Sequence, residues 1–96
     1  MMVGVCHLTL RLPENASFKG KRQVVKSLTA RVRNRYNVSI AEVDSQDSWQ
    51  IASLGISCVS NSHSHAQEVM TKVIGFVRSS RLDAEVIDWQ VEMLQA

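Results

Sequence analysis

The order in which apolar spacing changes along this chain limits what the chain can fold into. Apolar and polar residues alternate, as they do in strands with one buried face, over four segments: 3–12, 38–43, 49–59 and 84–94. Two other segments, 17–36 and 62–80, repeat apolar residues at helical spacing. The pattern therefore predicts a strand, a helix, two strands, a second helix and a final strand.

Connections of this kind place both helices on one side of the sheet when the crossovers are right-handed. We therefore expect an α+β fold, the ferredoxin-like β-α-β-β-α-β two-layer sandwich, with an antiparallel sheet in the order 4-1-3-2. One domain of this kind accounts for residues 1–96. Within it we expect the first and third strands to run parallel. Cys6 and Cys58 would then lie at opposite ends of the sheet, too far apart for a disulfide.

The first predicted helix is strongly basic. It holds seven of the eleven Lys and Arg residues and none of the nine acids: Lys19, Lys21, Arg22, Lys26, Arg31, Arg33 and Arg35. At 100° per residue its apolar residues form one arc, and a solvent-facing stripe on the other side contains Lys19, Arg22, Lys26 and Arg33. Solvated helices usually mix charges of both signs to gain small pair energies. The stripe is therefore predicted to bind a polyanion, with an ordinary solvated helix face as the alternative.

The outer face of the sheet has no predicted cover and carries aliphatic residues from all four strands. A contiguous patch of this kind usually marks a partner surface, so we expect a homodimer through Val3, Val5, Val43, Ile51 and Val86. The same face lacks the exposed aromatic residues on which RNA-recognition motifs stack bases. Nucleic acid would instead contact the basic helix through its phosphates.

Enzyme motifs are missing from the chain, so we expect no catalytic activity, no cofactor and no metal. Glu42, Asp44 and Asp47 lie about the predicted turn between the second and third strands. They leave open a weak metal or small-molecule regulatory site, or pairing with Arg33 or Arg35 at the end of the basic helix. The chain has no apolar stretch long enough to span a membrane and no secretory pattern at its start, so we expect a cytoplasmic protein.

Residues 17–55 resemble the YlxP-like family, small bacterial proteins of unknown function. The similarity rests on a helix start, a strand and a turn, at Ser17, Lys19, Lys21, Arg22, Ala41, Glu42, Gln46, Asp47, Trp49 and Gln50. The segment AEVIDWQVEML extends the resemblance to the last strand. The resemblance implies a ferredoxin-like fold and a cytoplasmic bacterial protein. Because members are often encoded beside translation factors and a ribosome-binding factor, it also implies a link to ribosome assembly or initiation.

These observations together predict a non-catalytic RNA- or ribosome-associated factor, with ribosomal RNA or a ribosomal subunit as its partner. The alternative is a dimeric protein-interaction or regulatory module that binds no nucleic acid. The Gln46–Gln50 segment is expected to adjoin the C-terminal end of the basic helix. There it would lock the hairpin or clamp a phosphate-bearing loop.

Overall fold

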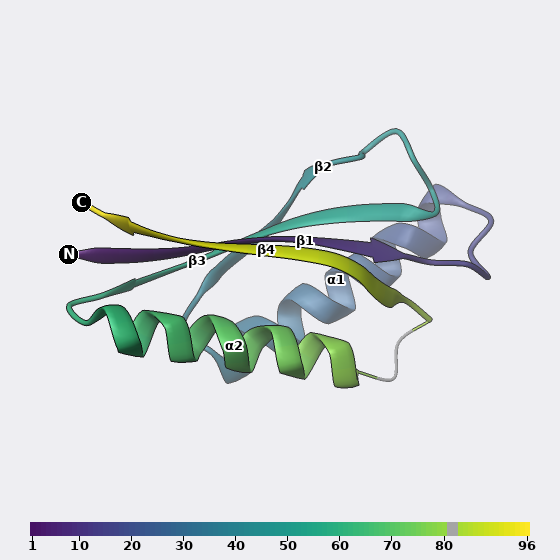
Figure 1. Cartoon of the computed structure of the whole chain (residues 1–96). Coiled ribbons are helices and arrows are strands. Elements are labelled where there is room, and N and C mark those ends of the chain that lie inside the picture. The colour runs from purple at the N-terminus through teal and green to yellow at the C-terminus, as the bar shows by residue number, and fades with distance from the viewer. Residues whose placement is uncertain (81–82) are drawn as a thin grey trace.

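The computed structural model describes residues 1–80 and 83–96 as four strands and two helices. Figure 1 shows the elements in chain order: β1 (Met2–Arg11), α1 (Phe18–Arg35), β2 (Ser39–Asp44), β3 (Ile51–Ser60), α2 (His63–Ser79) and β4 (Glu85–Gln95). In this part of the chain neither helix combines the length and the apolar character needed to cross a lipid bilayer.

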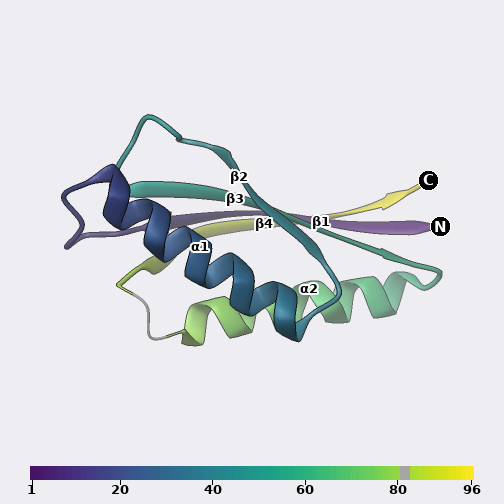
Figure 2. The ribbon, with the colours of Figure 1, turned by 180° about the vertical axis from the view of Figure 1, so that it is seen from behind.

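The strands form one antiparallel sheet in the order β2-β3-β1-β4, and both helices cover the same face of it (Figures 1 and 2). This confirms the predicted ferredoxin-like α+β fold, since the order is the expected 4-1-3-2 read from the other edge. Helix α1 packs on the β2 side of the sheet, whereas α2 packs on β1, β3 and β4. The two helices therefore occupy different halves of the layer.

The expectation that β1 and β3 run parallel was wrong. They are antiparallel, as they must be when β2 and β3 form a hairpin and the β1–α1–β2 crossover makes β1 parallel to β2. Cys6 lies opposite Ile56 and Cys58 lies opposite Gly4, so both thiols sit at the same end of the sheet. Both cysteines are nevertheless free and buried, and burial raises the pKa of the Cys6 thiol.

Both helices begin at serine caps. The Ser17 hydroxyl accepts the Gly20 N–H at 3.0 Å, and the Ser62 hydroxyl accepts the His65 N–H at 3.3 Å. A cap of this kind satisfies one of the backbone donors left unpaired in a first helical turn. It fixes where α1 starts, and so fixes where its basic residues lie along the sheet.

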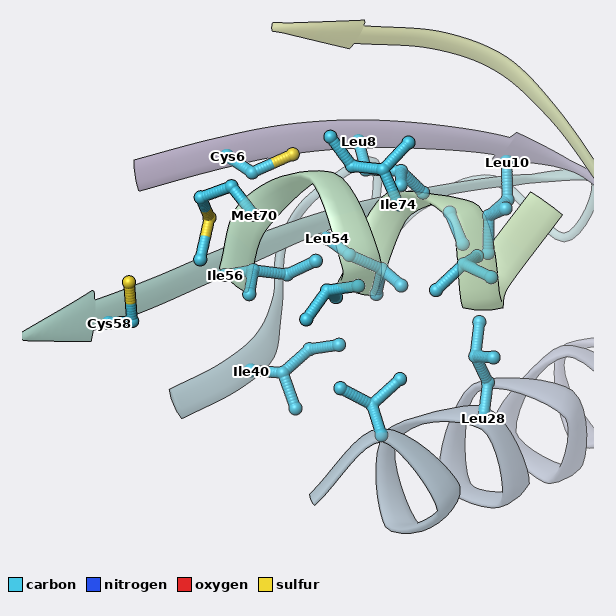
Figure 3. Close-up of a cluster of buried hydrophobic side chains, with 14 of the residues drawn as sticks. Cys6, Leu8, Leu10, Leu28, Ile40, Leu54, Ile56, Cys58, Met70 and Ile74 are labelled. Atoms are coloured by element: carbon cyan, nitrogen blue, oxygen red, sulfur yellow. The ribbon is translucent and has the colours of Figure 1, made fainter. Parts of the chain in front are cut away.

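The core fills the space between the sheet and the two helices (Figure 3). Alternate residues of β1 supply its centre, including Cys6, Leu8 and Leu10, and α1 contributes Leu28 and Val32. Val24, Val25 and Tyr36 of the predicted apolar arc pack against this core while partly buried. The arc therefore faces the sheet as expected, which leaves the opposite side of α1 in solvent.

Strand β4 departs from regular alternation near its start. The register between β1 and β4 shifts between Thr9 and Leu10, so that Thr9 pairs with Asp88 and Leu10 pairs with Val86. Because Leu10 faces the helices, Val86 packs against the core instead of pointing outward. Ile87 is the extra residue of this bulge and is half exposed. Assigning Val86 to the outer face was therefore wrong, because one inserted residue reverses the faces before it.

Candidate nucleic-acid interface

The charges of α1 are not those that helix stability alone would favour. The N-terminal end of a helix carries partial positive charge and prefers acids, yet the first turn of α1 has none and holds Lys19 and Lys21. Arg33 and Arg35 in the last turn do suit the negative end. The excess of cations at the start of the helix therefore needs an explanation from outside the helix.

The presence of Lys21 in the first turn is explained by its contacts with the loop that joins β2 to β3. Its side chain is buried, and its Nζ donates to the carbonyl oxygens of Ser45 and Ser48 at 2.7 and 2.6 Å. Nζ also lies 2.8 Å from Oε2 of Glu42. This last contact is an ion pair without hydrogen-bond geometry, because the buried Oε2 has no hydrogen-bond partner. Lys21 thus fixes the loop onto α1 and offers no charge to an external ligand.

Asn15 and Trp49 complete this connection. The Asn15 amide donates to the carbonyl oxygens of Trp49 and Ser17, and the Trp49 ring meets the Phe18 ring edge-on with centroids 6.0 Å apart. The Gln46–Gln50 segment therefore adjoins the N-terminal end of α1, and the expectation that it adjoins the C-terminal end was wrong. These contacts support the hairpin-locking role.

The turn acids take structural positions. Glu42 pairs with Lys21, and the Asp44 Oδ1 accepts the Ser45 N–H at 2.7 Å. The predicted pairing with Arg33 or Arg35 does not occur, since the loop folds toward the start of α1 and not its end. In the described part of the chain, no three His, Cys, Asp or Glu side chains gather in a way that could hold a metal ion.

The predicted stripe does lie together on α1. Lys19, Arg22 and Lys26 are exposed, at helical spacings of three and four residues. Arg33 continues the row and is exposed too, but one guanidinium nitrogen, Nη2, donates to the Ile40 carbonyl at 2.6 Å. Arg33 is thus held at the β2 edge with further N–H groups available. We call these four residues the stripe.

The structure adds a second basic group, which the predicted stripe does not include. Arg31 and Arg35 lie on the α2 side of α1, and both guanidinium groups stack over the Phe76 ring, at 5.5 and 5.3 Å from its centroid. A cleft of about 410 Å³ opens here, lined by Arg31, Arg35, Tyr36, Phe76, Ser79 and Ser80. Arg31 and Arg35 are four residues apart, and Phe76 flanks the apolar stripe of its own helix. The four-residue spacing of Arg31 and Arg35 could have identified this pair from the sequence.

Neither the stripe nor the Arg31–Arg35 pair is neutralised by an ion pair within the described residues. Among residues 1–80 and 83–96 the ion pairs are Arg11–Glu85, Lys21–Glu42 and Lys72–Glu68. None involves the stripe, Arg31 or Arg35. Three acids instead lie in β4, at the sheet edge farthest from β2: Glu85, Asp88 and Glu92. The protein thus has a cationic side along α1 and an acidic edge along β4.

The predicted dimer face is only partly assembled. Val3, Val5 and Ile51 lie on the outer sheet face, and Val43 covers Gly55 there, where an added Cβ would meet it at 2.8 Å. Val86 does not join them, for the reason given above. Val59 and Leu94 lie on the same face and flank Val3 on its two neighbouring strands.

Comparison with known proteins places these features in a family. A sequence model described as "Protein of unknown function (DUF503)" matches residues 3–91. The chain belongs to this family. It is also similar to the uncharacterized protein YlxP of Bacillus subtilis (strain 168), with 37% identity over 78 residues, which cover 81% of this chain and 85% of the relative.

The charged and capping residues at the start of α1 and in β2 through which this chain resembles the family divide into two groups in the structure. Ser17, Lys21 and Glu42 cap α1 or fix the β2–β3 loop to it. Lys19 and Arg22 extend into solvent and have no ion-pair partner within the described residues. The first group accounts for folding, which leaves the second as the part of the family pattern available to a ligand.

Proposed function

We propose that this protein is a non-catalytic RNA-binding factor that associates with the ribosome, contacting RNA phosphates through α1. One observation carries the proposal. Six exposed cations on one helix have no carboxylate within ion-pair distance among the described residues: Lys19, Arg22, Lys26, Arg31, Arg33 and Arg35. Neutralising phosphates with such groups releases counterions and supplies most non-specific affinity for nucleic acid.

Repulsion within α1 supports a ligand of opposite charge. Like charges three or four residues apart on a helix destabilise it by roughly 0.2–0.5 kcal/mol per pair. The pairs Lys19–Arg22, Arg22–Lys26 and Arg31–Arg35 all have this spacing. An added polyanion would relieve the repulsion.

The form of the surface favours RNA over a small anion. The stripe and the Arg31–Arg35 pair lie on the two flanks of α1, so no single small ligand would reach both. Folded RNA can present phosphates from two directions to one helix. The two arginines also have the planar groups that bind phosphate through paired N–H donors.

Sedimentation of the tagged protein in bacterial lysate through a sucrose gradient tests this function. We expect comigration with a ribosomal subunit at low salt, and release at high salt or after nuclease treatment. Charge reversal of Arg22, Lys26 and Arg33 to Glu should also abolish comigration while the protein stays folded by circular dichroism. A wild-type protein that stays at the top of the gradient at low salt would refute ribosome association.

Self-association through the outer sheet face is the second candidate. It is supported by the row formed by Val59, Val3 and Leu94, two of which are largely exposed, at 69% for Val59 and 42% for Leu94. Burial of such a row contributes roughly 25 cal/mol per Å² of apolar area, less the costs of association. This dimer would leave α1 free, so it is compatible with RNA binding.

A further inference from the structure

Strand β4 forms one edge of the sheet. It spans Glu85–Gln95, and among residues 1–80 and 83–96 it pairs only with β1, so the backbone groups of its other side have no neighbouring strand there. Natural edge strands are usually blunted by short length, by Pro, by bulges or by charged side chains, most often Lys. β4 has no Lys or Pro, its charged residues are all acids, and beyond the bulge at Ile87 it runs on without a further register shift. The edge is therefore open to another strand.

A groove borders this edge on the helix side. It has a volume of about 420 Å³ and is lined by Gln67, Thr71, Gly75 and Arg78 of α2 and by Trp89 and Val91 of β4. Apart from the neighbouring backbone of α2 itself, no atom of the described residues lies within 4 Å of the place a Cβ would take on Gly75, so the wall is open there. Trp89 and Val91 are 41% and 43% exposed, although their neighbours across the ladder, Leu8 and Cys6, are fully buried.

The other face of the same edge is acidic. Asp88 and Glu92 pair with Thr9 and Val5 of β1, which puts them on the outer sheet face, where both are exposed. Neither forms an ion pair within the described residues. Side chains of an added strand would alternate between this acidic row and the groove, because successive residues of a strand point to opposite faces. The apolar part of the groove is on β4, at Val91 and at the Trp89 ring, over which the Arg78 guanidinium lies 4.7 Å from the centroid.

We propose that the β4 edge binds an extended segment of another protein that alternates apolar and basic residues, added to the sheet as a fifth strand. Apolar side chains would fill the groove against Trp89 and Val91, while Lys or Arg side chains would lie beside Asp88 and Glu92. Peptides bind other sheet edges through backbone hydrogen bonds in the same mode. The inference does not depend on the function proposed for α1, which lies in the other half of the helix layer.

Charge argues against a second copy as the occupant. Two β4 edges in antiparallel pairing would bring Asp88 and Glu92 of both copies into one row on one face. Like charges opposite or diagonal to one another across strands destabilise the pairing. A basic, alternating segment removes this repulsion and gains opposite-charge contacts instead.

The test uses a seven-residue peptide that alternates Lys and Val, with a control peptide of the same composition that has four Lys followed by three Val. Binding to the full chain is followed by amide chemical shifts in NMR spectra. We expect the alternating peptide to shift β4 amides, and to bind at least tenfold more tightly than the control peptide. Equal binding of both peptides, or shifts confined to elements other than β4, would overturn the proposal.

Two charge-reversed proteins sharpen the result. Asp88→Lys with Glu92→Lys should weaken binding of the alternating peptide at least tenfold. The matched control, Glu14→Lys with Asp47→Lys, makes the same change in net charge at exposed acids elsewhere, and should bind within about twofold of the wild type. Equal losses in both variants would mean that net charge alone attracts the peptide. Concentration-dependent shifts of β4 amides without peptide would identify a second copy as the occupant. Either result would overturn the proposal.

Discussion

The Nζ atom of Lys21 lies 2.8 Å from Oε2 of Glu42, in a contact that joins the first turn of α1 to β2. Only 4% of the Lys21 side chain and 25% of the Glu42 side chain are exposed. Two N–H donors of the ammonium group are used by the Ser45 and Ser48 carbonyl oxygens. A cation in the most basic segment of the chain thus serves the fold.

Replacing Lys21 with Met should destabilise the protein substantially. The substitution keeps an unbranched side chain but leaves a partly buried carboxylate without its counter-charge and two carbonyl oxygens without their donor. Breaking a fully buried pair costs about 3–5 kcal/mol, so with Glu42 a quarter exposed we expect about 2–4 kcal/mol in the free energy of unfolding. Urea denaturation measures it.

Two controls accompany this prediction. Lys19→Met changes an exposed cation two residues away and should alter stability by no more than about 0.5 kcal/mol. Adding Glu42→Gln to Lys21→Met should recover part of the loss, because it removes the unpaired charge. If Lys21→Met and Lys19→Met had the same small effect, the contact would contribute nothing to stability.

Gly20 and Gly75 should respond in opposite ways to alanine. Both are helical, and Gly→Ala at an open helical site gains up to about 1 kcal/mol. A Cβ on Gly75 meets nothing within 4 Å, whereas one on Gly20 would overlap the Asn15 side-chain oxygen. Asn15 could not move without losing its bonds to the Ser17 and Trp49 carbonyl oxygens.

We therefore expect Gly75→Ala to raise the free energy of unfolding above that of the wild type. Gly20→Ala should lower the free energy of unfolding below that of the wild type by about 1–2 kcal/mol. Thermal and urea unfolding of the two variants side by side would measure the difference. A Gly20→Ala protein as stable as Gly75→Ala would show that Asn15 adapts freely.

The sequence was sufficient for the fold because local patterns agreed along the chain. Strand alternation placed Leu8 and Leu10 inside, and the serine caps at Ser17 and Ser62 fixed the helix starts. It failed where the outcome depended on a single residue, because the bulge at Ile87 reversed Val86. The expected placement of Cys6 and Cys58 at opposite ends of the sheet was a different error, since the predicted order of elements already requires β1 and β3 to be antiparallel.

The candidate site was predictable only in part for a similar reason. Helical spacing correctly separated Lys19, Arg22 and Lys26 from the core. It could not show that Lys21, also in the basic segment, reaches under a loop that begins more than twenty residues later. Nor could it show that α2 brings Phe76 beneath Arg31 and Arg35. Both depend on contacts between elements that packing alone brings together.

Cys6 and Cys58 should resist thiol reagents in the folded protein. Cys6 is fully buried, and burial raises the pKa of its thiol, which suppresses the reactive thiolate. We expect labelling with a thiol-specific chromophore only at the rate of unfolding, and rapid labelling in urea. Fast labelling of either cysteine at neutral pH, without denaturant, would indicate local opening at that end of the sheet.

Alkaline pH should weaken the fold partly through Cys6. In the unfolded chain the thiol ionises at about pH 8.5, whereas in the fold its pKa is higher. The contribution is fully present below the unfolded pKa and is lost as pH rises above it, since only the unfolded state then releases the proton. A Cys6→Ala protein should lose less stability between pH 8 and pH 10 than the wild type, measured by urea unfolding at each pH. Parallel losses would assign the alkaline effect to other groups.

The two basic groups of α1 should contribute separately to RNA binding. Replacing Lys19, Arg22 and Lys26 with Gln removes three cations of the stripe, while Arg31→Gln with Arg35→Gln removes the pair over Phe76. For every phosphate that a variant no longer neutralises, the magnitude of the negative slope of log affinity against log salt should fall by about 0.7 for single-stranded RNA. We therefore expect decreases of about 2 for the triple variant and about 1.4 for the double variant. Fluorescence anisotropy of a labelled single-stranded RNA, titrated at several salt concentrations, gives these slopes.

Arg11→Gln with Lys72→Gln is the matched control, because both cations are exposed but already paired with Glu85 and Glu68. This variant should leave the salt slope unchanged despite losing the same net charge as the Arg31/Arg35 variant. A slope lowered equally in both double variants would mean that RNA responds to net charge and not to α1. A slope lowered only by the triple variant would confine the interface to the stripe. Arg31 and Arg35 would then serve to cover Phe76 at the junction of the two helices.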